Sequence, residues 1–193
     1  EGGTYPHLVR RSLTGSVSEE LTPKDSFQFS ASFMPDGETL FYSNDGGKGN
    51  DILRLTMTTK RSEPAVASSF AELTPAASPD GKWLAYASNT TGAFEVYLQS
   101  IGSGEPVRIR ISANGGGNPS WRGDSQELFF LSTDDRVMSA RPSAAGRWED
   151  ATVTELFRLD GDLRSFVALP DGQSFLVADQ KAGAADDLFH VVK

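Results

Sequence analysis

The chain has 193 residues, a formal net charge of −8 at pH 7 and no cysteine. Its length allows one sizeable domain, and its acidic balance argues against a nucleic-acid partner, because such partners are bound by a clustered basic face. The lack of cysteine excludes disulfides, a thiolate nucleophile and cysteine metal sites, and no apolar run approaches the roughly 20 residues of a membrane span, so no membrane insertion is expected.

One pattern recurs four times along the chain: a strand of small residues, a turn with an aspartate, and a strongly apolar strand. The turn aspartates are Asp36, Asp80, Asp124 and Asp171, spaced 44, 44 and 47 residues apart. An aspartate in a turn accepts hydrogen bonds from backbone N–H groups two residues on, and a following glycine supplies a positive φ. The third copy has Ser125 where the other three have glycine. We therefore predict that the four aspartates are structural.

Regular repeats of this length predict a propeller or a solenoid. In chain order, residues 7–22 predict the third and fourth strands of a first unit, and the later units predict up to four strands each. First strands are expected at 30–32, 75–77, 119–121 and 166–168, third strands at 51–55, 95–99, 136–140 and 187–191, and fourth strands at 65–70, 107–111 and 153–157. No stretch has sustained helical periodicity, so the expected fold class is all-β.

These units predict a β-propeller of four-stranded antiparallel blades. A partial blade covers 1–24, blades follow at 25–68, 69–112 and 113–158, and a last blade covers 159–193. The count of 17 strands is one more than four complete blades need. We favour a piece of a larger propeller of roughly six to eight blades, with additional blades outside this chain. A smaller closed ring is the alternative.

Small residues in the first strands suit the centre of a propeller, where the blades converge and only slim side chains fit. The expected axial lining is polar but nearly uncharged, and consists of Ser30, Ser32, Ala76, Asn118, Ser120 and Ala168. Bulky aromatic residues are expected between the blades, where burial of each ring stabilises the fold. They are Phe41, Tyr42, Trp83, Tyr86, Tyr97, Phe129 and Phe130.

The most regular copy lies within residues 78–97. It reads Ser78-Pro79-Asp80-Gly81-Lys82, then Ala85-Tyr86-Ala87-Ser88, then Gly92 and Glu95-Val96-Tyr97. This pattern resembles the repeat of TolB-type, WD-like bacterial β-propellers, and residues 118–177 look like the last blades of such a propeller. The resemblance implies a propeller that binds protein partners in the periplasm or another extracytoplasmic compartment. Because such propellers are often joined to kinase or winged-helix domains, the expectation includes an effector domain outside this chain.

The sequence contains no nucleophile elbow, no Walker loop and no His-Glu-x-x-His motif. His7 and His190 fall on predicted third strands near the termini, and without a convincing carboxylate partner they make a poor metal site. The run Gly115-Gly116-Gly117 is interpreted as a linker between strands, and Asn89-Thr90-Thr91, although it matches a glycosylation sequon, is interpreted as a turn. We expect no catalytic residue, no bound metal and no cofactor.

Loops on a rigid β-scaffold commonly carry binding, so the candidate binding residues are taken from three loops. They are Asn44, Asp45, Lys48 and Asn50 in the first, Asn89 and Thr90 in the second, and Asp160, Asp162 and Arg164 in the third. A calcium ion needs six to eight converging oxygen ligands, and Lys48 opposes a cation in the segment richest in such ligands, residues 45–51.

The expected function is that of a non-catalytic binding module, which presents loops and a funnel face to a protein or peptide partner. The alternative is the propeller part of a hydrolase, either the gating domain of a prolyl-oligopeptidase-like peptidase or a glycosidase-like propeller. A propeller enzyme usually places acids, bases or metal ligands near the axis. The neutral axial lining therefore favours the binding module.

Overall fold

The computed structural model describes residues 5–14, 18–47, 49–102, 104–159, 162–180 and 188–192. In this part of the chain it contains seventeen strands and one short 3-10 helix, η1 (Trp148–Asp150). The fold class is all-β, as predicted, and all the strand pairings are antiparallel.

The strands form five sheets, and each sheet is built from strands that follow one another in the chain. The first is a hairpin of β1 (Val9–Arg11) and β2 (Ser18–Glu20). The second sheet holds β3 (Phe27–Phe33), β4 (Thr39–Asp45), β5 (Asn50–Thr56) and β6 (Arg61–Val66). The third holds β7 (Glu72–Ala77), β8 (Trp83–Ser88), β9 (Glu95–Ser100) and β10 (Arg108–Arg110). The fourth holds β11 (Gly117–Trp121), β12 (Leu128–Leu131), β13 (Arg136–Arg141) and β14 (Thr152–Arg158), and the last holds β15 (Asp162–Ala168), β16 (Phe175–Gln180) and β17 (Leu188–Val192).

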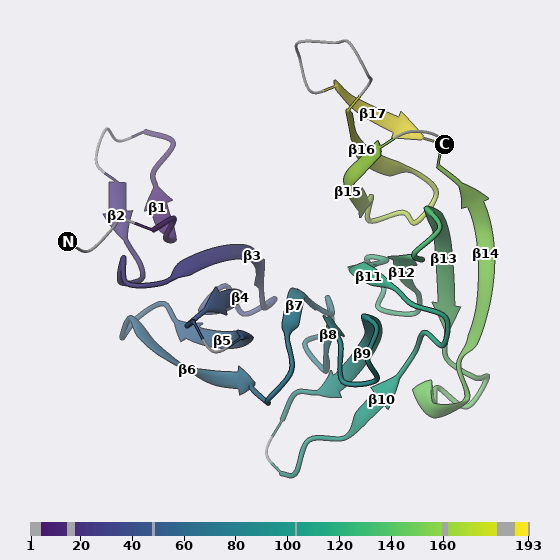
Figure 1. The fold of residues 1–193 in the computed structure, drawn as a ribbon, viewed down its shortest axis with the longest axis horizontal. Helices are drawn as coiled ribbons and strands as arrows, with labels where there is room; N and C mark the ends of the chain where they lie inside the picture. The colour runs from purple at the N-terminus through teal and green to yellow at the C-terminus, as the bar shows by residue number, and fades with distance from the viewer. Residues whose placement is uncertain are drawn as a thin grey trace.

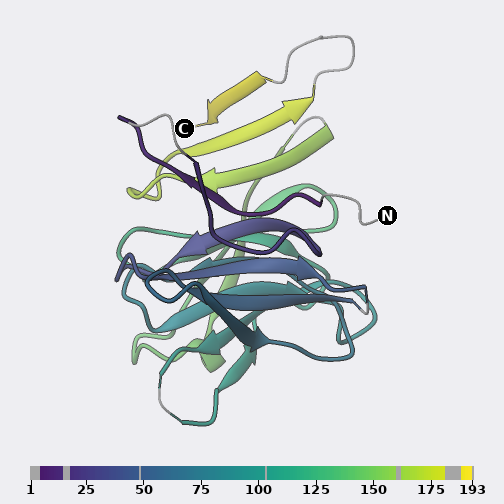
Figure 2. The ribbon, with the colours of Figure 1, turned by 90° about the vertical axis from the view of Figure 1, so that its left-hand side faces the viewer.

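The sheets stand side by side in an arc, which Figure 1 shows in full. Strands β3, β7, β11 and β15 lie on the inner side of the arc, and each of them contacts the next. The hairpin β1–β2 and the sheet β15–β17 form its two ends. Figure 2 shows that the strands run roughly along the direction from which Figure 1 is viewed, so the loops that join them gather at two ends of the molecule.

Apolar clusters fill the interfaces between neighbouring sheets, as the aromatic pattern predicted. The buried rings are Phe41, Tyr42, Tyr86, Tyr97, Phe129 and Phe130, and Trp83 is partly buried against the interface between the β7–β10 and β11–β14 sheets. These rings bury a large apolar area in a chain without disulfides, so packing between sheets is the main source of stability.

Hydrogen bonds also join neighbouring inner strands. Ser32 on β3 accepts a hydrogen bond from the backbone N–H of Ala77 on β7 at 3.0 Å, and Ser120 on β11 accepts one from the N–H of Ala168 on β15 at 2.9 Å. The corresponding residue on β7 is Ala76, which has no hydroxyl. At that junction the indole N–H of Trp121 donates instead to the Ala76 carbonyl at 3.0 Å. The two serines expected in the axial lining therefore hold the inner strands together.

Two predictions about strand positions are wrong. The fourth strand expected at 65–70 is β6 (Arg61–Val66), because a tight turn closes directly before it: the N–H of Lys60 donates to the Thr56 carbonyl at 2.8 Å, and Lys60 has a φ of +54°. His7, expected on a third strand, precedes β1, and its Nδ1 lies 3.3 Å from the Tyr5 carbonyl oxygen.

Candidate binding surface

The antiparallel order of each sheet places two kinds of connection at opposite ends of the strands. The loops between second and third strands, at 46–49, 89–94 and 132–135, share one end with the connectors that lead into the next inner strand, at 67–71 and 111–116. We call this the loop end. The turns that hold the four aspartates lie at the other end, the turn end. The predicted binding loops and the predicted structural turns are thus separated by the length of a strand.

At the turn end, each of the four aspartates accepts at least one backbone hydrogen bond within the turn that contains it. Asp36 accepts hydrogen bonds from the N–H groups of Glu38 and Thr39, both at 2.9 Å, and these bonds lower its pKa. The other three each accept one from the residue two positions on: Asp80 from Lys82 at 3.1 Å, Asp124 from Gln126 at 3.0 Å and Asp171 from Gln173 at 2.9 Å. The carboxylates serve the local turn geometry.

At the loop end, several candidate binding side chains are occupied by local hydrogen bonds. Asn44 accepts one from the hydroxyl of Ser26 at 2.6 Å, and Asp45 accepts one from the N–H of Gly47 at 2.9 Å. Asn89 accepts one from the N–H of Ala71 at 2.8 Å, so it ties its hairpin to the neighbouring connector. Thr90 shares a hydrogen bond of 2.8 Å with Ser88.

Several candidates are placed differently from the prediction. Asn44 and Asp45 end β4, and Asn50 begins β5, so these residues belong to paired strands. Asp162 and Arg164, expected in a loop, lie on β15, and His190 lies on β17. Lys48 and Asp160 lie outside the described residues.

The inner strands share a β-bulge that the sequence patterns did not predict. The pairing register shifts at Ser30, Thr74 and Asn118, and these residues have φ angles of +45°, +51° and +49°. A positive φ is unusual for serine and is strained for the β-branched threonine. The register of β15 shifts in the same way at Arg164. A strained conformation repeated at one level of successive inner strands marks the axial surface as a site candidate.

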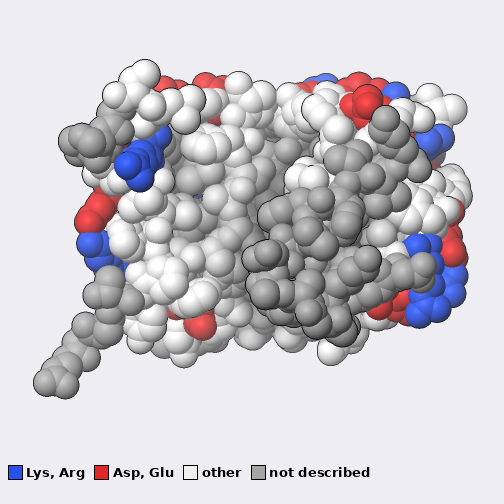
Figure 3. Space-filling model, turned by 90° about the horizontal axis from the view of Figure 1, so that it is seen from above, with Lys and Arg blue, Asp and Glu red and all other residues white. Residues whose placement is uncertain are grey.

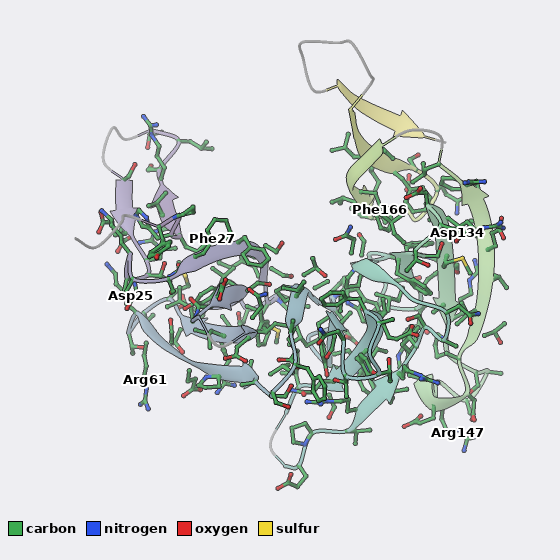
Figure 4. The ribbon with its side chains drawn as sticks, in the orientation of Figure 1. Asp25, Phe27, Arg61, Asp134, Arg147 and Phe166 are labelled. Carbon is green, nitrogen blue, oxygen red and sulfur yellow. The ribbon has the colours of Figure 1, made fainter. Side chains whose placement is uncertain are left out.

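These bulges line a hollow on the inner side of the arc. It has a volume of about 200 Å³, and Ala31, Pro75, Pro119 and Phe166 complete its lining. Figure 3 looks into the concave side of the arc: charged residues gather at the margins, and the described surface between them is uncharged. Figure 4 shows Phe27 and Phe166 on the inner side of the arc, from β3 and β15, with the labelled charged residues away from it.

A second, larger pocket opens beside the hollow, between the β7–β10 and β11–β14 sheets. We call it the interblade pocket. Its volume is about 310 Å³, and it shares Thr74 and Asn118 with the hollow. Leu73, Ala87, Phe94 and Leu131 form its apolar wall. Gly116 and Gly117 also line it, and Ser132, Thr133 and Asp135 add polar groups from the loop between β12 and β13.

The glycine run was the one available sequence signal for this pocket, and it connects β10 to β11, as its interpretation as a linker between strands predicted. A methyl group on Gly116 would lie 3.0 Å from a ring carbon of Phe130, and one on Gly115 would collide with Thr133. The run is closely packed, and its backbone is anchored by the N–H of Gly116, which donates to the Phe94 carbonyl at 2.8 Å.

The described side chains offer little for acid–base or metal chemistry. They include no group of three or more His, Asp or Glu residues placed to hold a metal ion. Glu72 is fully buried, and its Oε1 accepts hydrogen bonds from Ser68 at 2.6 Å and Ser88 at 3.3 Å. Burial raises the pKa of Tyr86 to about 12, which removes it as a proton donor near neutral pH. No helix in the described ranges is long and apolar enough to cross a membrane.

Comparison with known proteins identifies the fold. No protein-family model and no curated protein matches the sequence. Among solved structures, TolB from Acinetobacter baumannii is 16% identical, with a TM-score of 0.73 over 93% of this chain and 44% of that chain. A TolB structure from Agrobacterium tumefaciens is 22% identical, with a TM-score of 0.60 over 76% of this chain and 54% of that one. An oligogalacturonate lyase from Vibrio parahaemolyticus is 12% identical, with a TM-score of 0.61 over 95% of this chain and 55% of that one.

The chain therefore has a TolB-type β-propeller fold, and the resemblance predicted from its repeats is confirmed. It spans about half the length of these solved structures. The neighbours include both TolB proteins and a lyase, so the fold alone does not select a function.

Proposed function

We propose that this chain is a non-catalytic propeller module that binds a protein or peptide partner on its concave surface, at the hollow and the interblade pocket. The observation that carries the proposal is the uncharged hollow of about 200 Å³ on the inner side of the arc, to which Ser30, Thr74 and Asn118 contribute polar side chains from three successive inner strands. A concave surface with a few polar groups and no ionisable residue suits binding.

The distribution of acids supports binding over catalysis. The turn aspartates accept backbone hydrogen bonds at the turn end, and Asn44, Asp45 and Asn89 are used by the loops themselves. A hydrolase requires a nucleophile or an activated water, with a base held by an orienting group, close to one substrate atom. Asp135 is the one carboxylate among the described residues that line the two cavities, and a lone carboxylate does not make such a set.

A peptide-display selection against the purified chain tests the proposal. Ala31 is exposed and lines the hollow, so Ala31→Trp fills much of its volume of about 200 Å³ without disturbing the core. Selected peptides are expected to lose at least tenfold in affinity for Ala31→Trp. Glu38→Trp, an equally exposed change at the turn end, is the control and is expected to bind as the wild type does.

Two results would contradict the proposal. The first is that peptides bind Ala31→Trp and the wild type equally well. The second is turnover of peptide, ester, glycoside or oligogalacturonate substrates that remains through purification and is lost in Ala31→Trp. That second result would favour the alternative, in which the propeller belongs to an enzyme.

A further inference from the structure

The interblade pocket is lined by a glycine at a position where two other repeats have a long polar side chain. Two residues before the bulge, β3 carries Gln28, whose Nε2 donates to the Pro23 carbonyl at 2.9 Å. The same position on β7 is Glu72, which accepts hydrogen bonds from Ser68 and Ser88. In the third repeat this position is Gly116, directly before β11. The first two repeats thus have a long polar side chain at this position, and the third has none.

The glycine position beside the pocket is closely packed. Gly116 is in contact distance of Phe130, so a larger residue does not fit there without displacement of that ring. The apolar lining bridges two sheets, because Leu73 and Ala87 come from one sheet and Leu131 comes from the next. A volume of about 310 Å³ is near the lower limit for small-ligand sites, and it suits a single extended side chain.

The charge at the mouth of the pocket is negative. Asp135 is the one ionisable residue among the described lining residues, and no hydrogen bond or ion pair to its carboxylate is found in the described part of the chain. Its backbone is fixed on both sides: its N–H donates to the Ser132 carbonyl at 3.4 Å, and its own carbonyl accepts from the N–H of Leu159 at 2.8 Å. The nearest cation in sequence, Arg136, is engaged by Asp134 at 2.6 Å and by Glu155.

An apolar pocket with a single carboxylate in its lining matches the chemistry of a lysine or arginine side chain. Such side chains lay their methylene stems along apolar surface and keep the charged head at a polar edge. Phe94, which is 37% exposed, can add a cation–π contact at the same mouth. The net charge of −8 also favours association with a basic partner.

We propose that the interblade pocket receives a lysine or arginine side chain of the bound peptide, with the stem along Leu73, Ala87 and Leu131 and the cationic head at Asp135. This inference rests on the proposed function as a peptide-binding module, and it adds the chemical class of residue that the partner inserts.

A titration with N-acetyl-lysine methylamide, followed by backbone amide NMR, tests the pocket without any knowledge of the partner. The amide resonances of Gly117, Asn118 and Asp135 are expected to shift and saturate. N-acetyl-norleucine methylamide has the same stem without the charge and is expected to bind about tenfold more weakly, because it lacks the charge-assisted hydrogen bond. Added salt should weaken binding of the lysine compound and leave that of the norleucine compound unchanged.

Matched variants test whether the ammonium group of the lysine compound binds at Asp135. Asp135→Asn is expected to weaken binding of the lysine compound about tenfold. The variant should fold, since asparagine tolerates the φ of +62° at this position as well as aspartate does. Glu105→Gln removes an exposed carboxylate that lies outside the pocket lining, and this variant is expected to bind as the wild type does.

Equal binding of the two compounds, no shift at these amides, or an unchanged affinity of Asp135→Asn would overturn the inference. Those results leave the proposed function standing if peptides selected by display still fail to bind Ala31→Trp. A different result would contradict the proposed function itself: selected peptides would bind Ala31→Trp and the wild type equally well.

Discussion

Replacing Trp121 by phenylalanine is expected to lower the free energy of unfolding by about 2–4 kcal/mol. The indole N–H of Trp121 donates to the Ala76 carbonyl across the interface at 3.0 Å, and loss of such a bond costs about 0.5–1.5 kcal/mol. The ring is 7% exposed, and the smaller ring also removes buried apolar contacts, which adds about 2 kcal/mol at about 0.8 kcal/mol per buried carbon. In a chain of this length the change lowers Tm by roughly 2–4 °C per kcal/mol.

Trp148 provides the matched control for this measurement. It lies in the same cluster, is 4% exposed, and packs edge-on against Trp121 with ring centroids 5.3 Å apart. No hydrogen bond from its indole is found among the described residues, so Trp148→Phe should lose only the packing contribution. Urea unfolding of both variants is expected to differ by about 1 kcal/mol, the contribution of the bond between the inner strands. Equal losses would refute the argument that this bond replaces the missing serine at Ala76.

Three further predictions concern the turns, the acid response and cations. Asp80→Ala should lower the free energy of unfolding, measured by urea titration, by about 1–2 kcal/mol. Asp80→Asn should lower it by less, because the amide oxygen still accepts the hydrogen bond from the Lys82 N–H, and equal effects of the two variants would contradict this. Burial alone would raise the pKa of Glu127, but hydrogen bonds from Ser139, Arg141 and Arg122 lower it. The ionised Glu127 carboxylate therefore stabilises the fold above the ordinary pKa of glutamate, and this stabilisation is lost as the pH falls through the lowered pKa. The stability gap between wild type and Glu127→Gln should therefore narrow below about pH 4, and a gap that stays constant would argue against this linkage. Thermal melts with excess Ca²⁺ and with a chelator should coincide, and a Tm raised by Ca²⁺ would reveal a cation site.

The sequence was most informative where structure depends on neighbouring residues. The turn at Asp80 is built from a hydrogen bond between residues two positions apart, so its repetition could be recognised directly and its period led to the propeller fold. The aromatic residues were placed correctly between sheets for a similar reason: a strand such as β8, which carries Tyr86, is apolar on both faces because sheets cover it on both sides.

The candidate site could not be predicted, because it depends on contacts between repeats. The side chain of Asn89 accepts a hydrogen bond from the N–H of Ala71, eighteen positions away, and so holds its hairpin to the neighbouring connector. The local sequence around Asn89 does not indicate this contact. The bulge at Thr74 has no signature in composition, since threonine is a poor choice for a positive φ and is held there by the surrounding sheet. The glycine run at 115–117 was visible, but its role depends on the rings and side chains packed against it.

Differences between equivalent positions are the most useful guide to function in a repeat fold of this kind. Positions that serve the scaffold stay similar, as the four turn aspartates do, because each blade faces the same packing problem. The position two residues before the bulge changes from Gln28 to Glu72 to Gly116, and the glycine copy lines the interblade pocket. This pocket combines a departure from the repeat with a carboxylate, that of Asp135, which has no hydrogen bond or ion pair in the described part of the chain. It is therefore the part of this chain where selection for a ligand is the simplest explanation.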